Sequence, residues 1–138
     1  MIFVQAYLIR QVLPVWGPTR TAVVGLVATL LSFIGYAFVP VGWMMYPIIM
    51  VGALQGFVVP SVQSIMSAHI PANAQGELQG AVGSMSGLVA ILSPPFMTQL
   101  FSYFSSPQAP LHFPGAPFFA AAIFTLLALV LLLRAVAN

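Results

Sequence analysis

The sequence contains no cysteine and almost no charge, and both absences restrict what it can be. Without cysteine the chain has neither a disulfide bond nor a thiolate metal site. Only 3% of its 138 residues are charged, whereas soluble domains carry about 25%. The charged side chains are Arg10, Arg20, Glu77 and Arg134. So few charges cannot cover the surface of a water-soluble domain, and we expect lipid to surround most of the chain.

The scarcity of ionisable groups also argues against several functions. The arginines are scattered and form no basic patch that would bind nucleic acid. Nucleophilic or acid–base catalysis needs neighbouring groups, but Glu77 has no second carboxylate, and His69 and His112 fall in loops expected on opposite membrane faces. Metal binding needs clustered ligands, which the sequence does not offer. We therefore expect no enzymatic activity, no nucleic-acid partner, no metal and no bound cofactor.

Long apolar segments make up the rest of the chain, which is 61% hydrophobic with a mean hydropathy of +1.07. A helix needs about 20 apolar residues to cross the hydrocarbon core of a bilayer. Four segments satisfy this requirement, namely 21–39, 43–66, 77–104 and 116–134. Residues 1–13 are too short and indicate a partial helix, and proline-rich turns separate the segments. The predicted fold is an all-α membrane protein with four transmembrane helices and a partial N-terminal helix.

The arginines predict the orientation of this multi-pass protein in the membrane. Four spans would bring the loop 14–20, the loop 67–76 and the C-terminus to one face, with Arg10, Arg20 and Arg134 on that side. Arginine excess marks the cytoplasmic face of membrane proteins. We therefore expect the C-terminus in the cytoplasm.

Polar side chains within the spans are the candidates for function. Gln55, Gln63 and Ser84 lie in the two middle spans, whereas the last span has Thr125 as its only uncharged polar side chain before Arg134. An amide in hydrocarbon is costly unless it meets a partner or a wet cavity. The pattern predicts that the middle spans face the interior and that the last span faces lipid. Two interpretations stay open, because such groups can join helices or line a substrate pathway.

Glycine spacing predicts close helix packing. Small residues four positions apart let two helix backbones approach each other. The pairs with this spacing are Gly52 and Gly56, Gly76 and Gly80, and Gly83 and Gly87. Pro94 and Pro95 interrupt the longest span and predict a bend there.

Glu77 has two interpretations. At the start of a helix, its carboxylate would be stabilised by the helix dipole, by about 0.3–1 kcal/mol. Alternatively, it could form an ion pair with an arginine in a part of the protein outside this sequence. The first interpretation requires nothing beyond the sequence itself.

Three motifs resemble the C-terminal half of tetracycline-resistance-type drug exporters of the major facilitator superfamily. They are Pro60-Ser-Val-Gln-Ser-Ile-Met-Ser67, Gln75-Gly-Glu-Leu-Gln-Gly80 and Pro94-Pro95. In addition, Gly17 and Arg20 match a degenerate copy of the family's cytoplasmic loop G-x-x-x-D-R-x-G-R-R, whose other motif residues are missing here. The resemblance covers essentially the whole chain. It implies part of the C-terminal six-helix bundle of a twelve-span transporter.

The resemblance also implies a function. The chain would correspond to the end of the eighth span and the ninth to twelfth spans of a proton-coupled antiporter that exports drugs by alternating access in the bacterial inner membrane, conferring antibiotic resistance. Its partners would be the missing N-terminal half and a small-molecule substrate of unknown identity. The span 43–66 would lie beside the cavity and 77–104 between the halves, with 21–39 and 116–134 outermost. As a fragment, the chain would not transport alone.

One departure from the resemblance concerns the substrate. Tetracycline exporters carry an acidic residue in the helix that matches 21–39, where this sequence has Thr29. Tetracycline specificity therefore does not follow from the resemblance. The alternative function is that of a small self-associating membrane protein, an interaction module or minimal channel, that packs through its glycine faces.

Overall fold

The structure is a computed structural model, and it describes residues 7 and 9–137. Its α-helices are α1 (Ile9–Trp16), α2 (Pro18–Phe38), α3 (Met45–Gly52), α4 (Val58–Ala68), α5 (Gln75–Ser105) and α6 (Ala116–Ala137). Short 3₁₀ helices are η2 (Gly42–Met44), η3 (Ala53–Phe57) and η4 (Ala72–Ala74). Four helical segments are long and apolar enough to cross a membrane: Pro18–Phe38, Gly42–Ala68, Ala72–Ser105 and Ala116–Ala137. The predicted all-α membrane fold is confirmed.

The N-terminal region differs from the expected short helix and loop. Of the partial helix expected over 1–13, residues 1–6 and 8 lie outside the described residues, and the rest leads into α1. The loop expected over 14–20 is reduced to Gly17, because α1 continues to Trp16 and α2 begins at Pro18. Gly17 has a φ of +78°, a conformation that glycine adopts without strain. Pro18 then starts α2 with a φ suited to the first helical turn.

The second span is not one uniform α-helix. The 3₁₀ segment η3 separates α3 from α4 in the middle of the span. Pro60 lies four residues after Gly56 and has no N–H, so the Gly56 carbonyl cannot accept the usual helical hydrogen bond. This break was not predicted. Helix α5 continues as one helix through Pro94 and Pro95, and the bend expected there stays a prediction.

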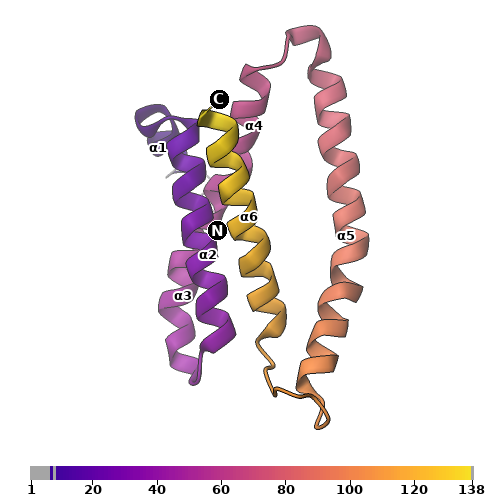
Figure 1. Cartoon of the computed structure of the whole chain (residues 1–138). Helices are drawn as coiled ribbons and strands as arrows, with labels where there is room; N and C mark the ends of the chain where they lie inside the picture. Colours follow the sequence, from indigo (N-terminus) through magenta and orange to yellow (C-terminus); the bar gives the residue numbers. More distant parts are fainter. Residues whose placement is uncertain (1–6, 8, 138) are drawn as a thin grey trace.

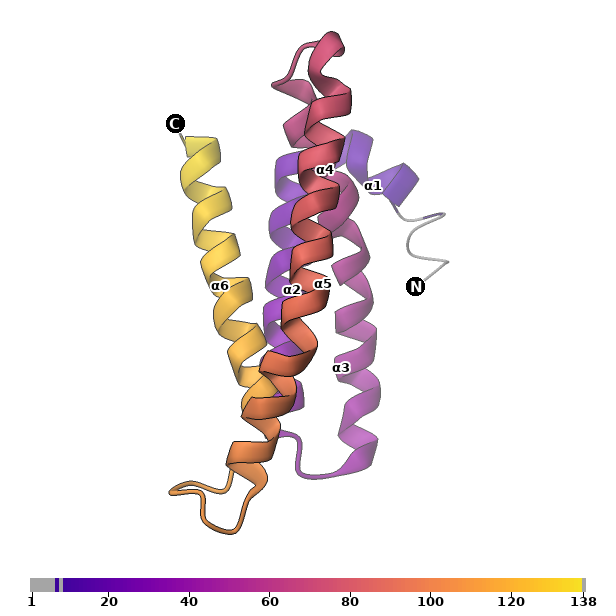
Figure 2. The same cartoon turned by 90° about the vertical axis from the view of Figure 1, so that its right-hand side faces the viewer.

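Helix α2 is the centre of the described bundle. It contacts α1, α3, η3, α4 and α6, and Figures 1 and 2 show α3 and α4 along one side of it and α6 along another. Its buried residues are mostly small: Thr21, Ala22, Gly25, Leu26, Ala28, Thr29, Ser32 and Ala37. Among the described helices this span is therefore central, and its expected outermost position in a complete transporter stays a prediction.

Helix α5 lies apart from the other helices along most of its length (Figure 1). Its main contacts are with η4 at one end and with α6. None of its residues is buried by the described helices, so the interior position that the polar pattern predicts for this span stays a prediction. The final helix α6 packs along α2 and buries Ala116, Ala122 and Thr125. Most of its other residues are exposed, so its expected contact with lipid stays a prediction.

The helices alternate in direction, so that the chain has two distinct ends. The start of α2, the turn between α4 and α5, and the end of α6 lie at one end of the molecule (Figure 1). Arg20, in the first turn of α2, and Arg134, in the last turn of α6, therefore share this end. The connections 39–41 and 106–115 lie at the other end.

Candidate functional site

Polar side chains gather at the middle of α2. Thr29 is buried and its Oγ1 donates a hydrogen bond to the Gly25 carbonyl at 2.7 Å. Ser32 is buried as well, and its Oγ lies 2.8 Å from the Ala28 carbonyl and 3.3 Å from the Ile48 carbonyl of α3. The hydroxyl has a single hydrogen, which the two carbonyls share, and the longer contact with Ile48 is a hydrogen bond between two spans. Ser32 therefore joins helices, which is one of the two roles considered for polar groups in the spans.

Three hollows adjoin one another at this depth. The first, of about 180 Å³, lies between α2 and the α3–η3 segment, and the second, of about 300 Å³, lies between α2, α4 and α6. The third, of about 710 Å³, lies between α5, α6 and α2. Phe33 lines all three hollows, so they form a row across the middle of the molecule.

The row of hollows has a mainly apolar lining with a few polar groups. Gln55 and Thr29 line the first two hollows, Thr125 lines the second and third, and Ser93 lines the third. Thr125 donates its hydroxyl hydrogen to the Ala121 carbonyl at 2.8 Å. A mostly apolar site with a few placed polar groups is typical of sites that bind small molecules. Among residues 7 and 9–137, no carboxylate, histidine, lysine or arginine lines these hollows.

The three sequence candidates for the pathway do not come together. Gln55 lies on η3, at the break in the second span, and is exposed to the hollows. Gln63 is half-buried on α4, and Ser84 is exposed on α5, where its hydroxyl donates to the Gly80 carbonyl at 2.9 Å. Neither of these two lines the row of hollows.

The glycines divide into a packed set and an open set. A Cβ atom at Gly25 would lie 2.8 Å from Val58 Cγ2 and 3.2 Å from the Leu54 carbonyl oxygen. At Gly52 it would lie 3.2 Å from Ser32 Oγ, and Gly56 is buried. Around the glycines of α5 the described chain leaves open space, with no atom within 4 Å of the corresponding Cβ positions at Gly76, Gly80, Gly83 and Gly87.

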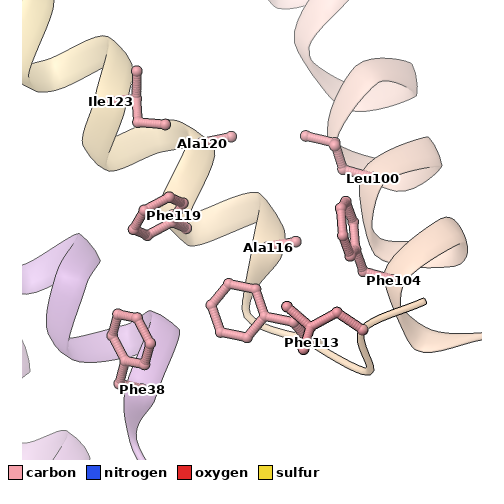
Figure 3. Close-up of a pocket in the computed structure, with 9 residues that line it drawn as sticks. Phe38, Leu100, Phe104, Phe113, Ala116, Phe119, Ala120 and Ile123 are labelled. Atoms are coloured by element: carbon pink, nitrogen blue, oxygen red, sulfur yellow. The ribbon is translucent and has the colours of Figure 1, made fainter. Parts of the chain in front are cut away.

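An aromatic cluster closes the end of the bundle opposite the arginines. The rings of Phe38 and Phe113 lie 5.4 Å apart between centroids, and Phe119 lies 6.2 Å from Phe38 and 6.1 Å from Phe113. Figure 3 shows these rings beside an apolar hollow of about 460 Å³, with Leu100 and Phe104 of α5 on its other side. The cluster links the end of α2 to the connection before α6.

The turn between α4 and α5 is hydrogen-bonded by two side chains for which the sequence predicted no such role. Gln75, the first residue of α5, donates from Nε2 to the Ser67 carbonyl at 3.0 Å and to the Ile70 carbonyl at 2.9 Å. The Nδ1 atom of His69 lies 2.8 Å from the Ile65 carbonyl. The last carbonyls of a helix lack partners in the helix itself. The signal in the sequence for bonding these carbonyls was a glutamine at the start of the helix that follows the turn.

The residues predicted for the cytoplasmic loop lie at the start of α2. The Gly17 carbonyl accepts hydrogen bonds from Thr21 N at 3.2 Å and Thr21 Oγ1 at 2.8 Å. Arg20 is exposed one position before Thr21. Glu77 is exposed in the first turn of α5, the position at which a helix dipole stabilises a carboxylate.

These features define the class of protein. Several apolar helices are long enough to cross the membrane, and among the described residues the polar groups that line the row of hollows are amides and hydroxyls. The chain is an integral, multi-pass membrane protein of helical type.

Comparison with known proteins identifies the family. The family described as Major Facilitator Superfamily matches residues 2–137, and the chain belongs to this family. Its relatives include the class G tetracycline resistance protein of Vibrio anguillarum, 36% identical over 62% of this chain and 22% of the relative. The class B and class C proteins of Escherichia coli are 25% and 28% identical over 72% and 71% of this chain, in each case 25% of the relative. No solved structure matches the chain significantly.

The chain therefore spans about a quarter of the length of the curated relatives that it matches. The family consists of membrane transporters, and the chain is not an enzyme. The resemblance inferred from the motifs at 60–67 and 75–80 is confirmed.

Proposed function

We propose that this chain is the C-terminal portion of a proton-coupled exporter of drugs or other small molecules, working by alternating access in the bacterial inner membrane. The observation that carries the proposal is the row of hollows at mid-span, with Gln55 and Thr125 among apolar and aromatic side chains. Such a lining suits an apolar, hydrogen-bonding organic molecule. The tetracycline resistance proteins named above support export as the activity.

Tetracycline itself is not the proposed substrate. Thr29 stands where the resemblance would place an acidic residue, and its hydroxyl hydrogen already bonds the Gly25 carbonyl. No carboxylate lines the hollows to replace that acid. The group that carries the proton would then lie in the missing N-terminal half of the transporter.

The missing helices would also complete the surroundings of α5. Its glycines face open space in the described chain, and small residues in a span favour close approach of another helix. The alternative of a small self-associating protein is not favoured, because the family match covers almost the whole chain.

An efflux assay tests the proposed pathway. In the transporter extended upstream of Met1, Gln55→Leu should lower drug efflux about tenfold, as expected when a polar contact of about 1.4 kcal/mol is lost. Gln63→Leu makes the same substitution at a glutamine that does not line the hollows, and it should lower drug efflux less. Equal efflux by the wild type and Gln55→Leu at equal membrane levels would overturn the assignment of this pathway.

Two further measurements test the remaining parts of the proposal. The isolated 138-residue chain should not extrude drugs, so robust extrusion by it would contradict the need for a second half. Tags inserted at residue 41 and after residue 138 should report the periplasm and the cytoplasm, respectively. The arginines lie at the same end of the molecule as the C-terminus, and an excess of arginine is typical of the cytoplasmic face. Tags that report the reverse sides would overturn the proposed orientation.

A further inference from the structure

The turn between α4 and α5 joins two spans that touch very little elsewhere. The principal contacts of α5 are with η4 and α6, and no residue of α5 is buried. Figures 1 and 2 show α5 leaving the turn as a long helix, and its middle reaches α6, where the rings of Phe96 and Phe124 lie 6.2 Å apart between centroids. The direction in which α5 leaves α4 therefore depends on the turn, together with the contacts of α5 with α6.

The side chain of Gln75 spans this turn. Its Nε2 atom carries two hydrogens, and the two hydrogen bonds to the Ser67 and Ile70 carbonyls use both of them. Ser67 belongs to the last turn of α4, and Ile70 lies just beyond its end. Gln75 itself is half-buried at the first position of α5. One amide thus connects the end of one span to the start of the next.

Gln79 provides a natural comparison. It is the same residue type, one turn further along α5, and it is exposed. Within residues 7 and 9–137, no hydrogen bond involves its side chain. The two glutamines of the Gln75-Gly-Glu-Leu-Gln79-Gly motif therefore differ in the contacts that they make.

We propose that Gln75 is a positioning residue that fixes α5 to the cytoplasmic-side end of α4, so that the two spans move as one rigid hairpin. The amide holds the turn through donation to two carbonyls, which a side chain of equal size without N–H groups cannot supply. The consequence for transport rests on the proposed function: a rigid hairpin carries any movement at η3 on to α5. The rigidity itself does not depend on what the protein transports.

Spin labels can measure this rigidity in the 138-residue chain, because the sequence has no cysteine of its own. Labels at Val59→Cys in α4 and Met85→Cys in α5 occupy exposed positions. In lipid nanodiscs, pulsed electron paramagnetic resonance should give a narrow distance distribution. Gln75→Met should broaden it about twofold, because both hydrogen bonds are lost, and the matched change Gln79→Met should leave it unchanged.

A second variant separates donation from size. Gln75→Glu keeps the shape of the side chain but cannot donate when ionised, so the distribution should be broad at pH 7. It should narrow in part near pH 3, where a carboxyl group with a pKa of about 4.3 is protonated and its one hydrogen can bond one of the two carbonyls. His69 and Glu77 also lie at this turn, so the labelled wild type at both pH values is the control.

The outcomes separate this proposal from the proposed function. An unchanged distribution in Gln75→Met, or a Gln75→Glu variant that is as broad at low pH as at neutral pH, overturns the role of the amide. Neither measurement involves transport, so a failure of the efflux assay leaves the result intact. Circular dichroism of each labelled variant confirms equal helix content before the distances are compared.

Discussion

Helices α2 and α5 are both apolar and long enough to cross a membrane, but the rest of the chain packs around α2 and leaves α5 exposed. Helix α2 buries eight residues and contacts five neighbouring elements, whereas α5 buries none of its 31 residues. Both are rich in glycine and hydroxyl side chains. The difference shows that small residues permit close packing but do not determine where it occurs, because the neighbouring helix must be present.

The largest expected effect tests this contrast directly. Gly25→Leu in α2 should destabilise the isolated chain by about 3 kcal/mol, because even a Cβ atom would collide with Val58 and the Leu54 carbonyl. Gly83→Leu in α5 should change stability by less than about 0.5 kcal/mol, since it faces open space. Unfolding in detergent micelles, followed by circular dichroism, measures both. Equal losses would show that the two helices are packed alike.

A second contrast lies in the connections between helices. In Gly115→Ala the new Cβ would collide with the backbone of Ala37, which cannot move as a side chain can, and we expect a loss of about 2 kcal/mol. Gly42→Ala is the control, because nothing lies within 4 Å of its Cβ position. It should be neutral or stabilising by up to about 1 kcal/mol. The same unfolding assay measures both variants. If Gly42→Ala lowers the stability more than Gly115→Ala, the contact between Gly115 and Ala37 is contradicted.

The smallest effects concern serine hydroxyls. Ser32→Ala should cost about 1 kcal/mol, because it removes the hydrogen bond to Ile48 of the neighbouring helix. Ser84→Ala on α5 removes only a bond within its own helix and should be near neutral. Thermal unfolding of the purified variants provides the comparison. If Ser84→Ala costs as much as Ser32→Ala, then joining two helices is not what makes Ser32 important.

Ser61 sharpens the same comparison. It is fully buried on α4, and its hydroxyl has no hydrogen-bond partner among the described residues. Removing a buried, unpaired polar group is neutral or stabilising, so Ser61→Ala should raise or preserve the unfolding temperature. A clear loss of stability would indicate that the hydroxyl has a partner in the folded protein.

The sequence was sufficient to predict the spans but not their arrangement. Hydropathy placed the four spans, because lipid imposes a minimum length on each apolar helix. It could not show that α2 lies at the centre, since helix packing in lipid depends on shape rather than on hydrophobicity. Gly25 is not part of a pair of glycines four positions apart, although Thr21 and Thr29 are small residues at that distance from it. The contact with Val58 exists only in three dimensions.

The candidate site could be predicted only in part, because its hollows are formed by residues that the fold brings together. Gln55 could be identified because an amide in an apolar span is unusual. Phe33, which lines every hollow of the row, looked like any other apolar residue. Gln75 was counted as part of a polar loop, and only the course of the backbone shows that its amide reaches back to α4.

The 3₁₀ segment η3 has a mechanical consequence for the second span. A 3₁₀ helix turns about 120° per residue and rises about 2.0 Å, against about 100° and 1.5 Å for an α-helix. Conversion of the five residues Ala53–Phe57 to α-helix would therefore twist α4 by about 100° relative to α3 and shorten the span by about 2.5 Å. Such a screw motion would turn the Gln55 amide toward a different neighbour without breaking the span.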